Sequence, residues 1–183
     1  NVTVFSANFA FYGDISSRIM HLISEIVPAC EVYSIDEVFV DLTDVDSPKD
    51  TAHHIRQQVL KCVGIPTCVG VGPTQTFAKV ANYLAKKRSV YNGVCILEDP
   101  QDIEEALKNL PIKEIWGIGR RLSLRLKQVG INTAYDLKKV DPRWMRQHFT
   151  VVGERLVQEL NGLSCLSLEE QPEPKKSIQV SRS

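Results

Sequence analysis

Residues 33–42, with the sequence YSIDEVFVDL, place two adjacent acids between two short runs of residues that favour β-strands. The runs are Glu31–Ile35 and Val38–Leu42, and only Asp36-Glu37 separates them. Two strand-forming runs joined by two residues are typical of a β-hairpin. The stretch therefore predicts an antiparallel hairpin whose turn carries two carboxylates.

The acidic pair at this turn is the sharpest chemical feature of the sequence. In a regular strand Asp36 and Glu37 would point to opposite faces, but at a two-residue turn both can project into the same space. Two carboxylates about 5 Å apart repel each other by ~3 kcal/mol at an effective dielectric constant of about 20. A divalent cation relieves this repulsion, and Mg²⁺ prefers such oxygen ligands. The alternative is a solvated acidic turn that binds no ligand.

The first hundred residues alternate between strand and helix patterns around this hairpin. In order, the patterns predict a strand at Val2–Phe5, a helix near 12–27 ended by Pro28, the hairpin, a helix from Ser47-Pro48 to Gly64, a strand at 66–71, a helix at 74–87 and a strand at Gly93–Leu97. This order, βαββαβαβ, is typical of a sheet with helices packed on it.

After Asp99-Pro100 the strand patterns stop and short helices take over. The predicted helices are 102–109, 112–116, 120–129, 134–139, 142–147 and 151–161. Their joints carry capping signals such as Thr133 with Asp136 three residues later. We therefore expect an α+β chain with a mixed domain at residues 1–100, a helical domain at 101–168, and a charged linker with a short β-like run at 169–183.

A glycine-rich turn leads into the helix predicted at 74–87. The run GVGPTQT, residues 70–76, precedes Lys79 and Lys86, which lie seven positions apart and hence on one side of that helix. Glycine-rich turns at helix N-termini can cradle phosphate, but neither the third glycine of a dinucleotide site nor the Gly-Lys-Ser/Thr of a P-loop is present. A tight strand-to-helix turn is the alternative interpretation.

A second glycine motif, IWGIGRR at residues 115–121, lies between two predicted helices. Two helices joined by a Gly-hydrophobic-Gly turn form the helix-hairpin-helix arrangement. Its backbone N–H groups can hold a DNA phosphate without reading bases. Arg120 and Arg121 add positive charge at that point. An ordinary corner between two helices is the alternative.

The charge distribution agrees with a local nucleic-acid site. The net charge is zero, with 22 basic and 22 acidic side chains, but residues 115–155 hold 9 basic and 3 acidic ones. A solvated helical face would show the same excess. The five cysteines form no Cys-x-x-Cys pair, the histidines lack zinc-ligand spacing, and no apolar run approaches the ~20 residues of a membrane span. We expect a cytoplasmic protein with reduced thiols and no membrane contact.

Together and in this order, the motifs resemble the Y-family translesion DNA polymerases. Ser34–Glu37 resembles the family's second catalytic carboxylate motif, Gly70–Lys86 the palm segment that follows it, and Trp116–Gly119 the thumb's helix-hairpin-helix. Phe5–Asn8 and Gly162–Cys165 are similar to the SOS mutagenesis branch, the UmuC/ImpB/MucB/SamB group. The resemblance covers essentially the whole chain and implies a partial palm at 1–100, a thumb at 101–168, and the start of a little finger after the linker.

The resemblance also implies roles for individual residues. Asp36 and Glu37 would bind the catalytic Mg²⁺ pair, Lys86 would contact the nucleoside triphosphate, Lys79 would make a DNA or structural contact, and Gly117, Ile118, Gly119, Arg120 and Arg121 would hold duplex DNA. The implied partners are primer–template DNA and deoxynucleoside triphosphates, together with a UmuD-like dimer, a recombinase filament and a sliding clamp.

Departures from the family pattern lead us to expect an internal fragment without polymerase activity. The family's first catalytic aspartate and its fingers segment have no counterpart here, the chain opens on Asn1 rather than methionine, and it stops within the β-like run. Extra residues between Lys86 and Gly93 also distinguish it from some relatives. A sheet without its central strand would have an exposed edge, through which the chain could dimerise.

Two other classes of function remain open at this point. A non-catalytic DNA-binding module would bind duplex DNA through the hairpin and would be indifferent to Asp36→Ala. A small nucleotide-binding α/β enzyme would use residues 70–76, and triphosphate alone would then protect it from thermal unfolding.

Overall fold

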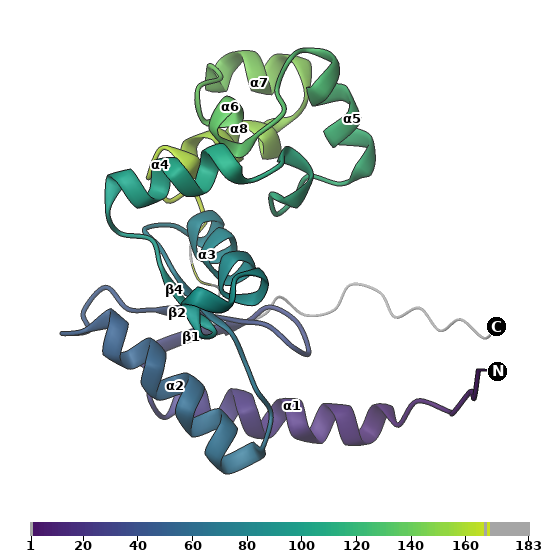
Figure 1. The fold of residues 1–183 in the computed structure, drawn as a ribbon, viewed down its shortest axis with the longest axis vertical. Helices are drawn as coiled ribbons and strands as arrows, with labels where there is room; N and C mark the ends of the chain where they lie inside the picture. The colour runs from purple at the N-terminus through teal and green to yellow at the C-terminus, as the bar shows by residue number, and fades with distance from the viewer. Residues whose placement is uncertain (1, 167, 169–183) are drawn as a thin grey trace. The chain divides into compact units, whose positions relative to one another are not determined.

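A computed structural model describes residues 2–166 and residue 168 of the 183-residue chain. Their packing forms two compact units, one of residues 2–44 together with residue 168 and the other of residues 45–166 (Figure 1). The predicted linker and the β-like run at 169–183 lie outside the described residues. Within the described part, no helix has the length and apolar character that crossing a membrane requires.

The first unit contains one long helix followed by a hairpin. Helix α1 spans Phe9–Ser24, strand β1 Ala29–Val32 and strand β2 Val38–Asp41. The side chain of Asn8 accepts a hydrogen bond from the Phe11 amide and so starts α1 earlier than predicted, and the helix ends at Ser24, before Pro28. The predicted strand at Val2–Phe5 was wrong: these residues form no strand and are exposed. Their apolar side chains favour a strand, but no neighbouring strand in the described residues pairs with them.

The hairpin itself is confirmed, with a longer turn than expected. Val32 lies opposite Val38 and Ala29 opposite Asp41 in an antiparallel ladder. The turn comprises residues 33–37, and the amides of Tyr33 and Ser34 both donate to the Glu37 carbonyl at 3.0 and 3.1 Å. The predicted two-residue turn was therefore wrong. The Ser34 hydroxyl donates to the Asp36 carboxylate at 2.7 Å, a local side-chain bond that competes with continuation of the strands.

The second unit contains the remaining elements. They are α2 (Pro48–Val63), β3 (Val69–Val71), α3 (Gln75–Lys87), the 3₁₀ helix η1 (Ser89–Tyr91), β4 (Val94–Ile96), α4 (Pro100–Asn109), the 3₁₀ helix η2 (Ile112–Glu114), α5 (Arg120–Gln128), α6 (Ala134–Lys138), α7 (Pro142–His148) and α8 (Val151–Leu160). Ser47 caps α2 through the Asp50 amide, Pro48 opens the helix, and Gly64 closes it at φ +78°. The α+β class is confirmed, and the order αββαβαβ matches the prediction after its first strand.

Strands β3 and β4 form a parallel pair that α3 connects and packs against. Gly70 allows this packing, because a Cβ there would overlap the backbone nitrogen of Asn82 and lie 2.7 Å from the Ala81 carbonyl carbon. The described strands make two separate two-stranded sheets, β1-β2 and β3-β4, rather than the single sheet expected from the element order.

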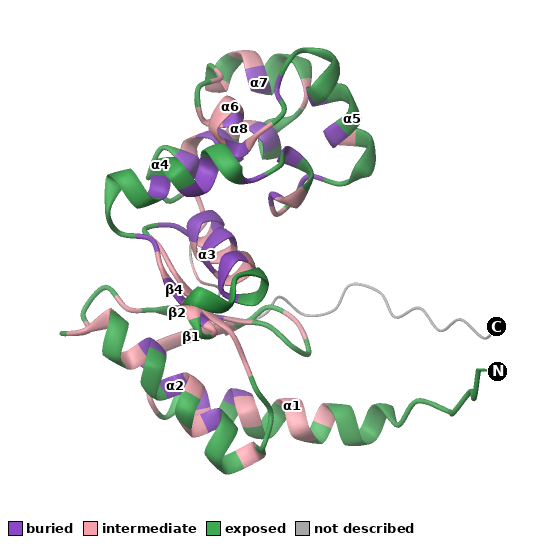
Figure 2. Cartoon of the chain, in the orientation of Figure 1, coloured by how far each residue is buried: buried purple, intermediate pink, exposed green. Residues whose placement is uncertain are grey.

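One continuous core runs from α3 and β4 through the helices α4 to α8. Its fully buried side chains include Phe77, Leu107, Leu126, Met145 and Leu160, and Figure 2 shows buried residues on each of these helices. Burying a side chain of this size contributes ~1.5–3 kcal/mol. The compact unit therefore extends across residue 100. Contacts between residues define this unit and do not test a domain boundary. The boundary predicted at residue 100 therefore stays a prediction.

The Thr133 capping box leads to a prediction about acid stability. Burial acts to raise the pKa of Asp136, but hydrogen bonds from the Asn132 and Thr133 amides, at 3.0 and 2.9 Å, outweigh it and hold the pKa below its ordinary value. The stabilisation is therefore complete above the unfolded pKa near ~4 and is lost as pH falls through the lower native pKa. Asp136→Asn should lower the free energy of unfolding by about 1 kcal/mol at neutral pH.

Urea unfolding of both proteins at neutral pH and at about pH 2.5 measures this effect. The difference between them should shrink at the lower pH, because the stabilisation by the carboxylate is lost as pH falls towards the lowered native pKa. An equal difference at both values would contradict the assignment of the effect to the Asp136 carboxylate.

Candidate functional site

The acidic turn lies on the surface of the first unit. Asp36 and Glu37 are both exposed, and the Asp36 carboxylate accepts the hydrogen bond from Ser34 described above. A carboxylate has about four acceptor positions, so this bond leaves Asp36 able to ligate a cation. No group of three or more His, Cys, Asp or Glu side chains within residues 2–166 and 168 could hold a metal ion. Carboxylate oxygens are of the ligand type that Mg²⁺ prefers.

A third carboxylate of the hairpin has a different environment. The Thr43 hydroxyl, together with the Thr43 amide at 2.9 Å, donates to Asp41 and lowers the pKa of that carboxyl from its ordinary value. Asp41 thus caps the turn that follows β2. It provides a matched control for substitutions in the acidic turn.

The glycine-rich run before α3 is a packing turn. Besides Gly70, Gly72 is required because a Cβ there would lie 2.6 Å from the Cβ of Phe77. The donors at the start of α3 are also used internally: Thr74 accepts from the Phe77 amide at 3.3 Å, and the carboxylate of Glu159 accepts from the Thr76 amide at 3.1 Å. The structure therefore favours the tight strand-to-helix turn over a phosphate cradle.

The two lysines of α3 have different surroundings. Lys86 is exposed in the last turn of the helix. Lys79 is half-buried, and its ammonium group lies 5.5 Å from the ring centroid of Trp116 in the glycine hairpin. This is cation–π distance, so Lys79 supports the hairpin. Sequence reasoning did not connect Lys79 with Trp116, because no periodicity links residues so far apart.

The hairpin at 115–121 is a compact turn between η2 and α5, as predicted. The Ile118 amide donates to the Ile115 carbonyl at 3.0 Å, and Gly117 has a left-handed backbone at φ +83°. Ile115 and Ile118 are buried, whereas Gly117 and Gly119 are exposed. Gly119 is the N-cap of α5 and provides no side-chain cap, so the first-turn amides of α5 can donate hydrogen bonds to an anionic ligand.

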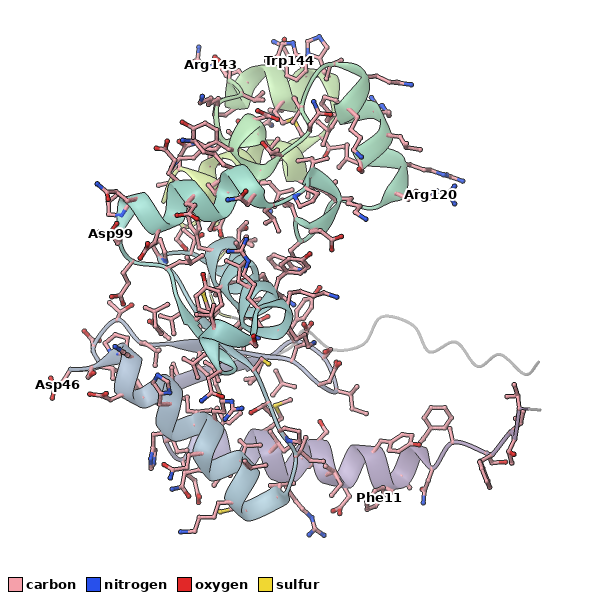
Figure 3. The ribbon with its side chains drawn as sticks, in the orientation of Figure 1. Phe11, Asp46, Asp99, Arg120, Arg143 and Trp144 are labelled. Carbon is pink, nitrogen blue, oxygen red and sulfur yellow. The ribbon has the colours of Figure 1, made fainter. Side chains whose placement is uncertain are left out.

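Arginine side chains surround this helix start. Arg120 and Arg121 are exposed, and Figure 3 shows Arg120 extending away from α5. One turn later, Arg125 donates to the His148 carbonyl at 3.0 Å and lies 4.8 Å from the Phe149 ring centroid. Arg125 therefore joins α5 to the end of α7, while Arg120 and Arg121 remain at the surface beside the hairpin.

Two family models match the chain in the regions that carry these motifs. The model described as the impB/mucB/samB family matches residues 1–83, and the model described as the IMS family HHH motif matches residues 100–131. The first region contains the acidic turn, and the second contains the glycine hairpin.

Individual relatives match over most or all of the chain. Protein SamB of Salmonella typhimurium is 43% identical over 187 residues, and protein UmuC of the same species is 42% identical over 186. Each match covers 100% of this chain and 44% of the relative, so the chain spans less than half the length of these relatives. DNA polymerase IV 1 of Halalkalibacterium halodurans is 35% identical over 85% of the chain and 37% of its own length.

Solved structures with the same fold are also polymerases. A DinB family error-prone DNA polymerase from Sulfolobus solfataricus superimposes with a TM-score of 0.75 at 26% identity, covering 92% of this chain and 51% of that one. An insertion ternary complex of Dbh DNA polymerase gives a TM-score of 0.71 at 27% identity, covering 87% and 47% respectively.

Proposed function

The chain belongs to the impB/mucB/samB family, and on that premise we propose that it is part of a DNA-directed DNA polymerase for translesion synthesis. The observation that carries the proposal is the presence, in one chain, of an exposed Asp36-Glu37 turn and an uncapped hairpin with Arg120 and Arg121. The first is suited to a divalent cation and the second to a DNA phosphate.

The acidic turn and α3 would provide the groups for nucleotidyl transfer. Asp36 and Glu37 would hold Mg²⁺, which when bound neutralises phosphate charge and favours ionisation of the primer 3′-hydroxyl. Lys86 would contact the triphosphate of the incoming nucleotide, a role supported by its exposure in the last turn of α3. Lys79, beside Trp116, would serve the DNA-binding hairpin.

The hairpin would hold the sugar–phosphate backbone of the duplex. Gly117 and Gly119 allow a phosphate to approach closely, Ile118 anchors the turn in the core, and the arginines at 120 and 121 add charge. Contacts of this kind position DNA but carry no sequence information. Such binding suits an enzyme that must accept any template sequence.

The remaining proposals follow from the family. The substrates would be primer–template DNA and deoxynucleoside triphosphates, the compartment the cytoplasm, and the protein partners a UmuD-like dimer, a recombinase filament and a sliding clamp. We also propose that the 183-residue chain alone does not extend a primer, because the family's first catalytic aspartate and its fingers segment have no counterpart in this sequence.

Duplex binding tests the hairpin assignment. The double variant Arg120→Gln/Arg121→Gln should bind duplex DNA roughly tenfold more weakly at low salt, because it loses two phosphate-neutralising charges. The slope of log affinity against log salt concentration should fall in magnitude by about 2. Fluorescence anisotropy with a labelled duplex at several salt concentrations measures both quantities.

The control is Lys49→Gln/Lys61→Gln, which removes the same charge from exposed positions of α2. Its salt dependence should match that of the unaltered chain. A hairpin variant whose slope equals that of this control would exclude the hairpin as the DNA contact.

A further inference from the structure

Glu159 of α8 is a fully buried acid whose two carboxylate oxygens are both bonded to backbone amides. One oxygen accepts from the Thr76 amide at 3.1 Å and the other from the Cys165 amide at 2.7 Å. The Glu159 carbonyl also accepts from the Thr74 hydroxyl at 3.2 Å. One residue of α8 therefore holds the start of α3 and the segment that follows α8.

Helix α8 also supports the glycine hairpin. A Cβ placed on Gly117 would lie 3.7 Å from Leu156, which is less than one helical turn before Glu159. Leu156 of α8 therefore lies beside Gly117 of the hairpin, and the start of α3 is bonded to the same helix.

A second contact joins α3 to the hairpin directly. Lys79, one helical turn beyond Thr76, places its ammonium group over the Trp116 ring at 5.5 Å. Lys86 lies two turns further along the same side of α3. The helix that carries the lysine proposed for triphosphate binding therefore contacts the proposed DNA-binding hairpin through Lys79 and Trp116.

We infer that Glu159 is a positioning residue that sets α3 against α8, and through the Lys79–Trp116 contact sets the lysine-bearing helix against the DNA-binding hairpin. The functional consequence rests on the proposed function: triphosphate at Lys86 and duplex at the hairpin would be placed by one shared connection. We assign a positioning role because a buried carboxylate specifies one arrangement of the backbone segments that it joins. An apolar side chain of similar volume would fill the site without the desolvation cost of a carboxylate, but it would leave the Thr76 and Cys165 amides without acceptors.

Glu159→Gln is the informative substitution because it keeps the shape and changes the bonding. An amide group has one acceptor oxygen, so its NH₂ would face one of the two backbone N–H groups. In ¹H–¹⁵N spectra of the full chain, we expect the indole signal of Trp116 to shift, with the Trp144→Phe variant identifying it among the two tryptophans. Exchange of the Thr76 amide hydrogen should accelerate about tenfold or more.

The indole signal of Trp116 distinguishes a positioning role of Glu159 from a role in stability alone. A residue that only stabilises the fold lowers the melting temperature and leaves the native-state signal of a distant indole in place. The matched control is Glu154→Gln, on the same helix, which removes the carboxylate paired with Arg146 at 2.8 Å and should leave the Trp116 signal unchanged. If Glu159→Gln does not fold, Glu159→Asp keeps the charge and shortens the reach. An unshifted Trp116 signal in the folded variant would overturn the inference.

Duplex binding adds a test that depends on the proposed function. We expect Glu159→Gln and Lys79→Met each to weaken duplex binding about threefold, and the double variant to be no weaker than the single ones, because both act through one connection. If the losses of duplex binding in the two single variants add in the double variant, Glu159 does not act on the hairpin through Lys79. If the unaltered chain does not bind duplex, the proposed role of the hairpin fails, while the indole signal still decides the role of Glu159.

Discussion

A chimaeric polymerase that depends on this chain should lose about a thousandfold in primer-extension rate when Asp36 is replaced by asparagine. The chimaera would carry this chain in place of the matching part of DNA polymerase IV 1 of Halalkalibacterium halodurans, where the two are 35% identical. Asparagine retains the size of the side chain but removes the negative charge that a hard divalent cation requires. The rate is measured with a primed template, Mg²⁺ and deoxynucleotides.

The control in the same hairpin is Asp41→Asn. Its carboxylate is bonded to Thr43 and belongs to the turn after β2, so its replacement should change the extension rate by less than about threefold. The isolated 183-residue chain should give no extension. An Asp36→Asn chimaera as fast as the unsubstituted one would refute the catalytic assignment, and duplex binding retained by that variant would favour the non-catalytic DNA-binding module.

Replacing Gly70 with alanine should lower the free energy of unfolding by about 3 kcal/mol or more. The added methyl group would overlap the backbone of α3 at Asn82 and crowd Ala81, and a backbone cannot move aside as a flexible side chain can. The strand and the helix would have to separate, which would disturb a core that includes the fully buried Phe77. Urea unfolding followed by far-UV circular dichroism measures the change.

The same substitution at Gly13 is the control. Gly13 lies within α1, and a Cβ there meets no atom within 4 Å. Alanine should therefore stabilise that helix, by up to about 1 kcal/mol, because it loses less backbone entropy than glycine. A destabilisation at Gly70 no larger than 1 kcal/mol would show that β3 and α3 can separate at low cost, contrary to our interpretation of this glycine.

Several helix boundaries were predictable because the capping residue is adjacent in sequence to the helix. Ser47 and Thr133 each cap the helix that the sequence predicted at that point, because a cap involves residues only two or three positions apart. The glycine hairpin was predictable for the same reason, since its turn and its uncapped helix start lie within seven residues. The start of α1 was missed because Asn8 was not considered as a cap.

The candidate site also has features that the sequence identified and features that it did not. The sequence alone identified the acidic turn, the two lysines of α3 and the hairpin with its arginines, because each is a contiguous motif or a helical repeat. It did not identify the surroundings of Lys79 beside Trp116 or the bonds of Glu159 to Thr76, both of which join residues from separate elements.

The sequence by itself determined the element types, most helix ends and the motifs of the site, since propensity, capping and periodicity act over a few residues. Tertiary structure alone decided that Val2–Phe5 forms no strand, that the strands pair as two sheets, and that Gly70 serves packing. The physical reason is the separation along the chain between the residues that interact. Strand pairing, close backbone approach and burial of a charge such as Glu159 depend on partners that only the folded chain brings together.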